Sequence, residues 1–207
     1  MSQLGCSRRS TALLRSSVML GALLMVTPTM SGCGYNEVID RDQSVKASWS
    51  EVENQYQRRA DLVPNLVRVV QGAANFEKST LQAVVEARAK VGSMRVDQSV
   101  VDDPEKLKQF EQAQGQLSGA LSRLLVVSEQ YPELKSTASF RDLQVQLEGT
   151  ENRIAVARRR FITSVADYNA TVLKFPSSIG SKLRGMKERP SFTAATPGAD
   201  KAPEVKF

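Results

Sequence analysis

The side chains in this chain that could do chemistry are carboxylates and guanidinium groups. The 207-residue sequence contains no histidine and only two cysteines. The absence of histidine excludes Ser-His-Asp and Cys-His catalysis. No Walker loop, Gly-x-Gly-x-x-Gly motif or Ser-x-x-Lys motif is present either. Catalysis would therefore have to use acidic side chains, and a metal would have to bind oxygen ligands.

One pair of acids has a spacing that suggests catalysis. Glu148 and Glu151 lie one helical turn apart, and two acids can hydrolyse a glycosidic bond, for example in a cell-wall sugar. The favoured interpretation is a polar helix edge, since charge alone rarely indicates an active site. Asp102 and Asp103 could suggest a calcium site, but the ligand spacing of an EF-hand is absent. They are therefore interpreted as helix caps. No catalytic residue, metal ligand or cofactor-binding residue is predicted.

A basic cluster comprises Arg153, Arg158, Arg159 and Arg160. Consecutive helical residues point about 100° apart, so the three consecutive arginines cannot form one basic face. A solvated surface is the favoured interpretation. The alternative is that Arg153, Arg159 and Arg160 contact an anionic lipid surface or an acidic partner.

The segment QRRADLVPNL, residues 57–66, places polar side chains where a helix needs an apolar face. Positions 45, 52, 66 and 73 form an apolar row that Arg59 interrupts. A guanidinium group in such a row is costly unless a carboxylate meets it. Glu151 is the expected partner of Arg59, with Asp61 or Glu148 as alternatives. Such a pair would fix the register between two helices.

Two further residues belong to this polar seam. Arg158 lies at the edge of the apolar face of the last predicted helix. Pro64 is expected inside a helix that continues with a kink, because the apolar spacing keeps its phase across the proline. The proline leaves the carbonyl of Ala60 without its helical donor. Arg59, Asn65 or a water molecule is expected to bond to that carbonyl.

Long amphipathic helices must position these side chains. Apolar residues recur at intervals of three and four, close to a heptad seam. The pattern predicts helices over residues 40–73, around 81–91, from a cap at Asp102 or Asp103 onward, and from Ser136 or Thr137 to Pro176. The predicted fold is all-α: an antiparallel up-and-down four-helix bundle over residues 40–182 with long first and last helices. Residues 183–207 are rich in proline and alanine without any period, which predicts a disordered tail.

Residues 1–32 have the pattern of a bacterial lipoprotein signal peptide. Arginines at positions 8, 9 and 15 precede an apolar run at 18–26 and small residues before Cys33. Ser31-Gly32-Cys33 resembles a lipobox, although Met30 replaces the usual leucine. The resemblance implies cleavage before Cys33, lipidation of its thiol with fatty-acyl chains such as palmitate, and a short tether over residues 33–39. A retained transmembrane helix is the alternative, but a bilayer span needs roughly 20 apolar residues.

Two long stretches of the sequence resemble the LemA family. Residues 35–88, which include QYQRRADLVPNLV, resemble its N-terminal half, and residues 131–176, which include RDLQVQLEGTENRIAVARRRF, resemble its C-terminal half. The chain departs from the family pattern at Asn75-Phe76, where a histidine often stands, and at Gly185-Met186. The resemblance implies an all-helical bundle attached to a membrane by its N-terminus, with the domain outside the cytoplasm. It implies no enzymatic activity, because the family has no agreed one.

These observations predict a lipid-anchored interaction or scaffold module of the cell envelope, with an unidentified envelope protein as its partner. The alternative is a cell-envelope carbohydrate hydrolase that uses Glu148 and Glu151. Loss of the signal peptide would halve the net charge of +6, which is too little to indicate nucleic-acid binding. No small-molecule substrate is expected. The predicted location is the cell membrane or the outer membrane, and Gly34 favours the outer one because it replaces a common inner-membrane retention aspartate.

Overall fold

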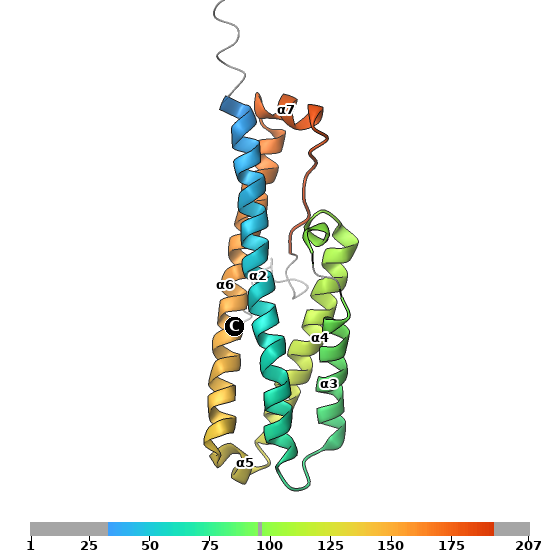
Figure 1. Ribbon diagram of the computed structural model, residues 1–207, viewed down its shortest axis with the longest axis vertical. Helices are drawn as coiled ribbons and strands as arrows, with labels where there is room; N and C mark the ends of the chain where they lie inside the picture. The colour runs from blue at the N-terminus through green and yellow to red at the C-terminus, as the bar shows by residue number, and fades with distance from the viewer. Residues whose placement is uncertain (1–32, 95–96, 193–207) are drawn as a thin grey trace, which may run out of the picture.

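The computed structural model describes residues 33–94 and 97–192, with side chains from residue 36 onward (Figure 1). Every regular element in these ranges is helical. The elements in chain order are α2 Cys33–Gln71, α3 Lys78–Gly92, the 3-10 turn η1 Gln98–Val101, α4 Pro104–Ser128, α5 Pro132–Ser136, α6 Ala138–Leu173 and α7 Ser177–Leu183.

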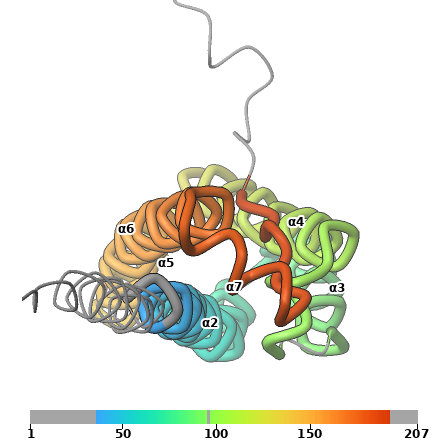
Figure 2. Tube along the Cα trace, turned by 90° about the horizontal axis from the view of Figure 1, so that it is seen from above, coloured from blue at the N-terminus to red at the C-terminus, as the bar shows by residue number. Residues whose placement is uncertain are grey.

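The predicted all-α bundle is confirmed. Helices α2 and α6, with 39 and 36 residues, are its long first and last helices and run side by side along the molecule (Figures 1 and 2). Helices α3 and α4, with 15 and 25 residues, pack against each other as a shorter pair. Because this pair is short, η1 and residues 184–192 cover the rest of the long pair (Figure 1).

The buried apolar side chains form two clusters. The tryptophan core surrounds Trp49, whose ring centroid lies 5.3 Å from that of Phe110 and 5.4 Å from that of Phe161. It includes residues of α2, η1, α4 and α6, together with Phe192. The leucine core lies among α2, α3, α4, α5 and α6; its members include Val63, Leu66, Val84, Leu117, Leu124, Phe140 and Leu147.

Side-chain caps set the starts of two helices. Asp103, one of the two predicted caps, accepts hydrogen bonds from the backbone N–H groups of Glu105 (2.9 Å) and Lys106 (3.3 Å). Thr137 caps α6 by accepting from the N–H of Phe140 at 3.4 Å. Each cap satisfies backbone donors that the helix itself leaves unpaired.

The predicted tether over residues 33–39 is wrong, because α2 begins at Cys33. Val38 is only 3% exposed and belongs to the tryptophan core. It stands seven residues before Val45, so it extends the apolar row of the first predicted helix by one further step. The packing of that row keeps residues before position 40 helical.

The predicted start of the disordered tail at residue 183 is also wrong. Leu183 ends α7, and the chain then returns along the bundle to Phe192, which is buried 5.2 Å from the ring of Phe161. Residues 184–192 follow no helical period, so a pattern search finds nothing there. Their packing depends on single side chains that meet distant residues. The predicted signal peptide, residues 1–32, and the rest of the tail, residues 193–207, lie outside the described residues.

Candidate functional site

A polar layer separates the two cores, and Arg59 lies at its centre. Arg59 is 1% exposed and stands in α2 between Tyr56 of the tryptophan core and Val63 of the leucine core. Its hydrogen-bond partners are Gln114 and Ser118 of α4 and Glu151 of α6. Arg59 and these three partners are called the polar layer below.

Arg59 joins three helices through its two terminal nitrogens. Nη1 donates to Glu151 Oε1 at 2.8 Å and to the hydroxyl of Ser118. Nη2 donates to the side-chain oxygen of Gln114 and, at 3.2 Å, to the backbone carbonyl of the same residue. The expected meeting of Arg59 with Glu151 is therefore present in the structure. The contacts with α4 were not foreseen.

The guanidinium group of Arg59 has an apolar environment on one side and a solvent-exposed partner on the other. The guanidinium carbon lies 5.0 Å from the centroid of the Tyr56 ring, within range of a cation–π contact. The side chain of Glu151 is 46% exposed, so water reaches the carboxylate and weakens the pair. Among the described residues, Nε of Arg59 has no hydrogen-bond partner. The layer is therefore a joint between three helices, and Gln114 and Tyr56 at its side also line a pocket between α2, α3 and α4.

The two alternative partners of Arg59 make other contacts. Asp61 accepts a hydrogen bond from Gln57 at 2.9 Å, and Glu148 accepts one from Gln144 at 3.0 Å. Both contacts lie on exposed helix surfaces and join residues four positions apart. Glu148 and Glu151 are thus engaged separately, the first at the surface of α6 and the second with Arg59.

Pro64 lies inside α2, which continues to Gln71 as expected. The carbonyl of Ala60 accepts a hydrogen bond from Nε of Arg88 in α3, at 3.2 Å. The expectation that Arg59 or Asn65 would bond to this carbonyl is wrong, because Arg59 is directed into the polar layer and Asn65 accepts from Arg68. A neighbouring helix therefore supplies the donor that the proline lacks.

Arg158 continues the polar contacts into the tryptophan core. Its guanidinium group donates to Glu111 at 3.0 Å and to the hydroxyl of Tyr56 at 3.2 Å. The guanidinium carbon lies 4.1 Å from the centroid of the Phe192 ring. Arg158 therefore connects α6 to α2, to α4 and to the returning C-terminal segment.

The other arginines of the basic cluster are exposed, and two of them, Arg159 and Arg160, line one surface pocket together with Glu51. Arg160 donates to Glu51 of α2 at 2.7 Å, whereas Arg159 donates to the carbonyl of Ala155 in its own helix at 3.4 Å. Arg153 is exposed on α6. These arrangements fit a solvated surface.

Gln114 and Ser118 are the site residues that the sequence reasoning missed. Gln114 interrupts the row Leu107, Leu121 at the seven-residue interval, just as Arg59 interrupts its own row. That signal was present in the sequence and identifies Gln114 as a buried polar residue. Ser118 lies four residues later, where no comparable signal exists.

Arg189 forms a second polar cluster, between the C-terminal segment and the bundle. Its Nε donates to Asp102 at 2.8 Å, and its backbone exchanges two hydrogen bonds with the side chain of Asn169. Nη1 lies 2.9 Å from Asp42 Oδ1 without the alignment of a hydrogen bond. Burial raises the pKa of the neighbouring Tyr168; Asp42 and Asp102 add to this rise, and Arg189 opposes it.

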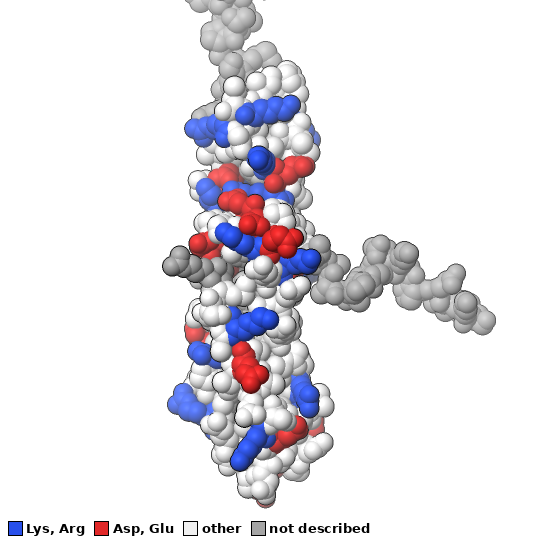
Figure 3. Space-filling view, turned by 90° about the vertical axis from the view of Figure 1, so that its right-hand side faces the viewer, with Lys and Arg blue, Asp and Glu red and all other residues white. Residues whose placement is uncertain are grey.

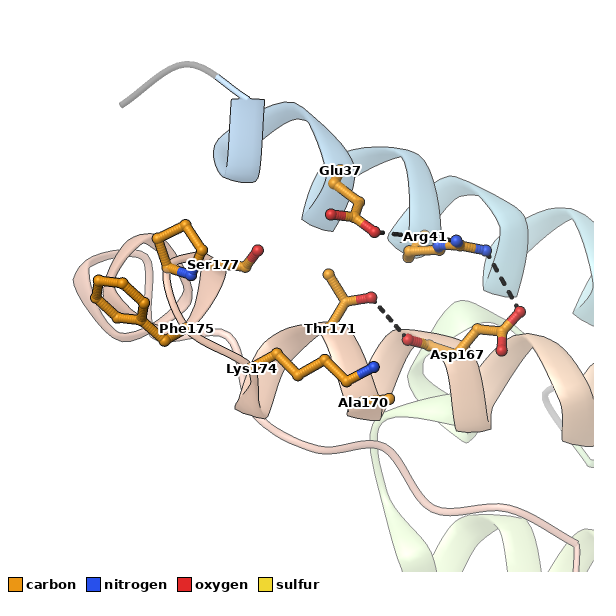
Figure 4. A pocket seen from close by; sticks show the side chains of 9 residues that line it. Glu37, Arg41, Asp167, Ala170, Thr171, Lys174, Phe175 and Ser177 are labelled. Atoms are coloured by element: carbon orange, nitrogen blue, oxygen red, sulfur yellow. Dashed lines mark hydrogen bonds and ion pairs between the residues drawn. The ribbon is translucent and has the colours of Figure 1, made fainter. Parts of the chain in front are cut away.

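A pocket lies where α2, α6 and α7 meet (Figure 4). Arg41 of α2 donates to Asp167 of α6 at 3.3 Å and lies 3.9 Å from Glu37. Phe175 and Lys174, between α6 and α7, line the other side. Both acids in this pocket are paired with Arg41.

Among the described residues, no three acidic or cysteine side chains are arranged so that they could hold a metal ion. Within the same part of the chain, none of the helices combines the length and the apolar character needed to span a bilayer.

Comparison with known proteins relates the chain to one family. The magnetosome protein MamQ of Magnetospirillum gryphiswaldense is 28% identical over 170 residues, which are 74% of this chain and 62% of the relative. MamQ 2 of Paramagnetospirillum magneticum is 26% identical over 174 residues, covering 76% of this chain and 64% of the relative. Protein LemA of Metamycoplasma hominis is 23% identical over 140 residues, covering 68% and 60%.

The chain thus spans less than two thirds of the length of each of these relatives. The model of the LemA family matches residues 48–207, which include most of the bundle and the whole polar layer. This chain therefore belongs to the LemA family.

Proposed function

We propose that this protein is a membrane-anchored helical bundle on the extracytoplasmic side of the cell envelope, where it serves as a protein-interaction or scaffold module without catalytic activity. The observation that supports this proposal most directly is the ion pair between Glu151 and Arg59. Glu151, one of the two acids whose spacing suggested catalysis, instead joins α6 to α2 in the polar layer. The ion pair with Arg59 would hold this carboxylate in the polar layer and make it less available to a substrate.

The shape of the bundle suits a spacer or scaffold. Helix α2 starts at the residue proposed to carry the lipid and runs without interruption for 39 residues. At a rise of 1.5 Å per residue, such a helix is about 58 Å long. An anchor at Cys33 would therefore hold one end of the bundle at the membrane and carry the α2–α3 connection and α5 away from it (Figure 1). The far end would then be accessible to an envelope protein.

The anchor itself is proposed from the lipobox-like Ser31-Gly32-Cys33. Two acyl chains bind a bilayer stably because each buried methylene contributes about 0.8 kcal/mol. The names of the relatives, magnetosome protein and Protein LemA, state no reaction, which agrees with a non-catalytic role.

Mass spectrometry of the mature N-terminus tests the anchor. The full chain, expressed in a bacterial host, should be recovered from the membrane fraction with a lipidated Cys33 as its first residue. Cys33→Ser should remain uncleaved and unlipidated. Soluble, full-length and unmodified wild-type protein inside the cell would overturn the proposed anchor.

Capture from detergent extracts tests the scaffold role. Full-length protein at native abundance should bring down a stable envelope protein, and a matched lipoprotein of unrelated fold should not. Repeated recovery of the bait alone would contradict this role.

The hydrolase alternative is tested separately with peptidoglycan. The purified protein should release no fragments. Release that is abolished by Glu151→Gln, in a variant whose circular dichroism and urea midpoint match those of the wild type, would establish the alternative instead.

A further inference from the structure

Helix α7 has its apolar side chains on the outside. Ser177 and Ser181 face the bundle and are buried, and the hydroxyl of Ser181 donates to the carbonyl of Ser177 at 3.0 Å. Ile179 and Leu183 face outward and are 56% and 85% exposed. A helix on the surface of a water-soluble bundle normally has the opposite arrangement, with its apolar face toward the core. The reversed pattern indicates that another apolar phase meets this surface.

The exposed apolar residues are concentrated at this place. Nine large apolar side chains are well exposed in the described part of the chain, and four of them lie within residues 173–183. They are Leu173, Phe175, Ile179 and Leu183, called the apolar end below; Phe175 is 81% exposed. The other five are scattered along α3, α4 and α6. Single exposed apolar residues are ordinary, whereas a contiguous group marks an interaction surface.

Basic residues flank the apolar end. Residues 173–187, LKFPSSIGSKLRGMK, contain Lys174, Lys182, Arg184 and Lys187 and no aspartate or glutamate. In Figure 3, the charged side chains nearest the upper end of the molecule are basic, whereas both signs are mixed along the shaft. Glu37 and Asp167, the two acids that line a pocket together with Lys174 and Phe175, are paired with Arg41. Apolar side chains framed by cations match the interface of an anionic bilayer.

The apolar end lies beside the start of α2. Val38 and Ile39 of α2 line a small pocket together with Gly180 and Arg184 at α7. Figures 1 and 2 show α7 crossing the same end of the bundle at which α2 begins. Cys33 is the first residue of that helix, and the apolar run at residues 18–26 precedes it in the chain. Any membrane attachment through this N-terminus would bring α7 to the bilayer surface.

We propose that the apolar end inserts into the headgroup region of an anionic bilayer as a second membrane contact. This inference rests on the proposed attachment at the N-terminal end of α2. Lys174 and Lys182 would meet lipid phosphates while Ile179 and Leu183 enter the acyl boundary. Two contacts at one end would restrict the tilt of the bundle, which a single flexible lipid anchor would not do.

Fluorescence depth measurements test the proposal on the intact chain. Leu183→Cys is made in the lipoprotein purified from membranes, in which cleavage removes Cys6 and acylation blocks the thiol of Cys33, so that only the new thiol takes an environment-sensitive dye. The labelled protein is reconstituted through its N-terminus into phosphatidylcholine vesicles containing phosphatidylglycerol. Val145→Cys is the matched control, because Val145 is an exposed apolar residue of α6, 67% exposed, far from α7. The dye at position 183 should shift to the blue, be quenched by a lipid-phase quencher and be shielded from iodide. The dye at position 145 should behave as in water.

Vesicle flotation separates the two proposals. Protein that does not float contradicts the proposed membrane attachment. Protein that floats with the dye at position 183 as accessible to iodide as the dye at position 145 overturns insertion of the apolar end. Since the vesicles contain no other protein, that second result would also be expected if a protein partner covered this surface. In the variant Lys174→Gln/Lys182→Gln, the shielding of position 183 from iodide should decrease and should lose its dependence on ionic strength. Unchanged shielding with unchanged salt dependence would contradict the proposed contact of Lys174 and Lys182 with lipid phosphates.

Discussion

Nη1 of Arg59 lies 2.8 Å from Oε1 of Glu151, across the boundary between the tryptophan core and the leucine core. This ion pair joins the two long helices, α2 and α6, at one level along the bundle. The guanidinium group also donates to Gln114 and Ser118, so three helices share one buried cation. Sliding α2 along the other two helices would draw this cation away from Glu151, Gln114 and Ser118 together, and separating a buried charge from its partners is strongly unfavourable.

Removal of the arginine should destabilise the bundle. Arg59→Ala leaves a cavity and deprives the buried oxygen of Gln114 of its donor, so we expect a loss of about 3 kcal/mol in the free energy of unfolding. Arg59→Leu fills much of the space and should cost less, about 1–2 kcal/mol, because the main remaining penalty is the buried Gln114 oxygen without its donor, whereas Ser118 and Glu151 are less buried. Glu151→Gln, at a half-exposed site, should cost below about 1 kcal/mol. Urea denaturation measures all three, and equal midpoints for Arg59→Ala and wild type would contradict the polar layer.

The hydrogen bond from Arg88 to the carbonyl of Ala60 should matter only because of Pro64. Arg88→Ala in the wild type leaves this carbonyl without its cross-helix donor and should cost about 0.5–1 kcal/mol. In the Pro64→Ala background the backbone N–H of residue 64 returns as the donor, so the same Arg88→Ala change should cost close to nothing. A double-mutant cycle by urea denaturation measures the difference. Equal costs in both backgrounds would show that Arg88 does not compensate for the proline.

The segment after α7 should contribute to stability as a core element. Phe192 is buried against Trp49, Phe161 and Arg158, so Phe192→Ala should lower the free energy of unfolding by about 3 kcal/mol. The exposed Phe175→Ala is the matched control and should have little effect on stability. Thermal and urea unfolding compare the two. An unchanged midpoint for Phe192→Ala would show that the segment does not pack on the bundle.

Stability should fall in alkaline solution in a way that depends on Tyr168. Its folded-state pKa is raised above the ordinary value of 10.0, mainly because the phenol is buried. The folded state therefore holds the phenolic proton more tightly than the unfolded state. The resulting stability is fully present below pH 10 and is lost as the pH rises from 10 through the folded-state pKa. Tyr168→Phe should remove this component, so its loss of stability above pH 10 should be shallower than that of the wild type; identical slopes would contradict the prediction.

The helical character and the approximate helix boundaries were predictable from local patterns. Intervals of three and four between apolar residues identify helices because they reflect the helical repeat. Asp103 before Pro104 and Thr137 before the last long helix mark helix starts through the same local logic, since a cap bonds to backbone groups two or three residues away. The interruption of an apolar row by Arg59 also predicted a buried arginine that meets a carboxylate, with Glu151 as the first candidate and Asp61 or Glu148 as alternatives; the structure shows the pair with Glu151.

The remaining parts of the structure depend on contacts between distant residues. The Ala60 carbonyl receives its donor from Arg88 in another helix, 28 positions away. Phe192 completes a core whose other rings belong to α2, α4 and α6. Neither contact leaves a periodic trace, because one side chain at one position is enough to make it.

The sequence by itself determined that this chain builds long helices with buried polar interruptions, because the apolar period is a property of neighbouring residues. Only the tertiary structure decided how the interruptions are resolved: Arg59 bridges three helices, and the chain after α7 packs back onto the tryptophan core. It also decided that α7 turns its serines inward and its apolar residues outward. The physical reason is that burial is set by what packs against a residue, and that neighbour is supplied by a distant part of the chain.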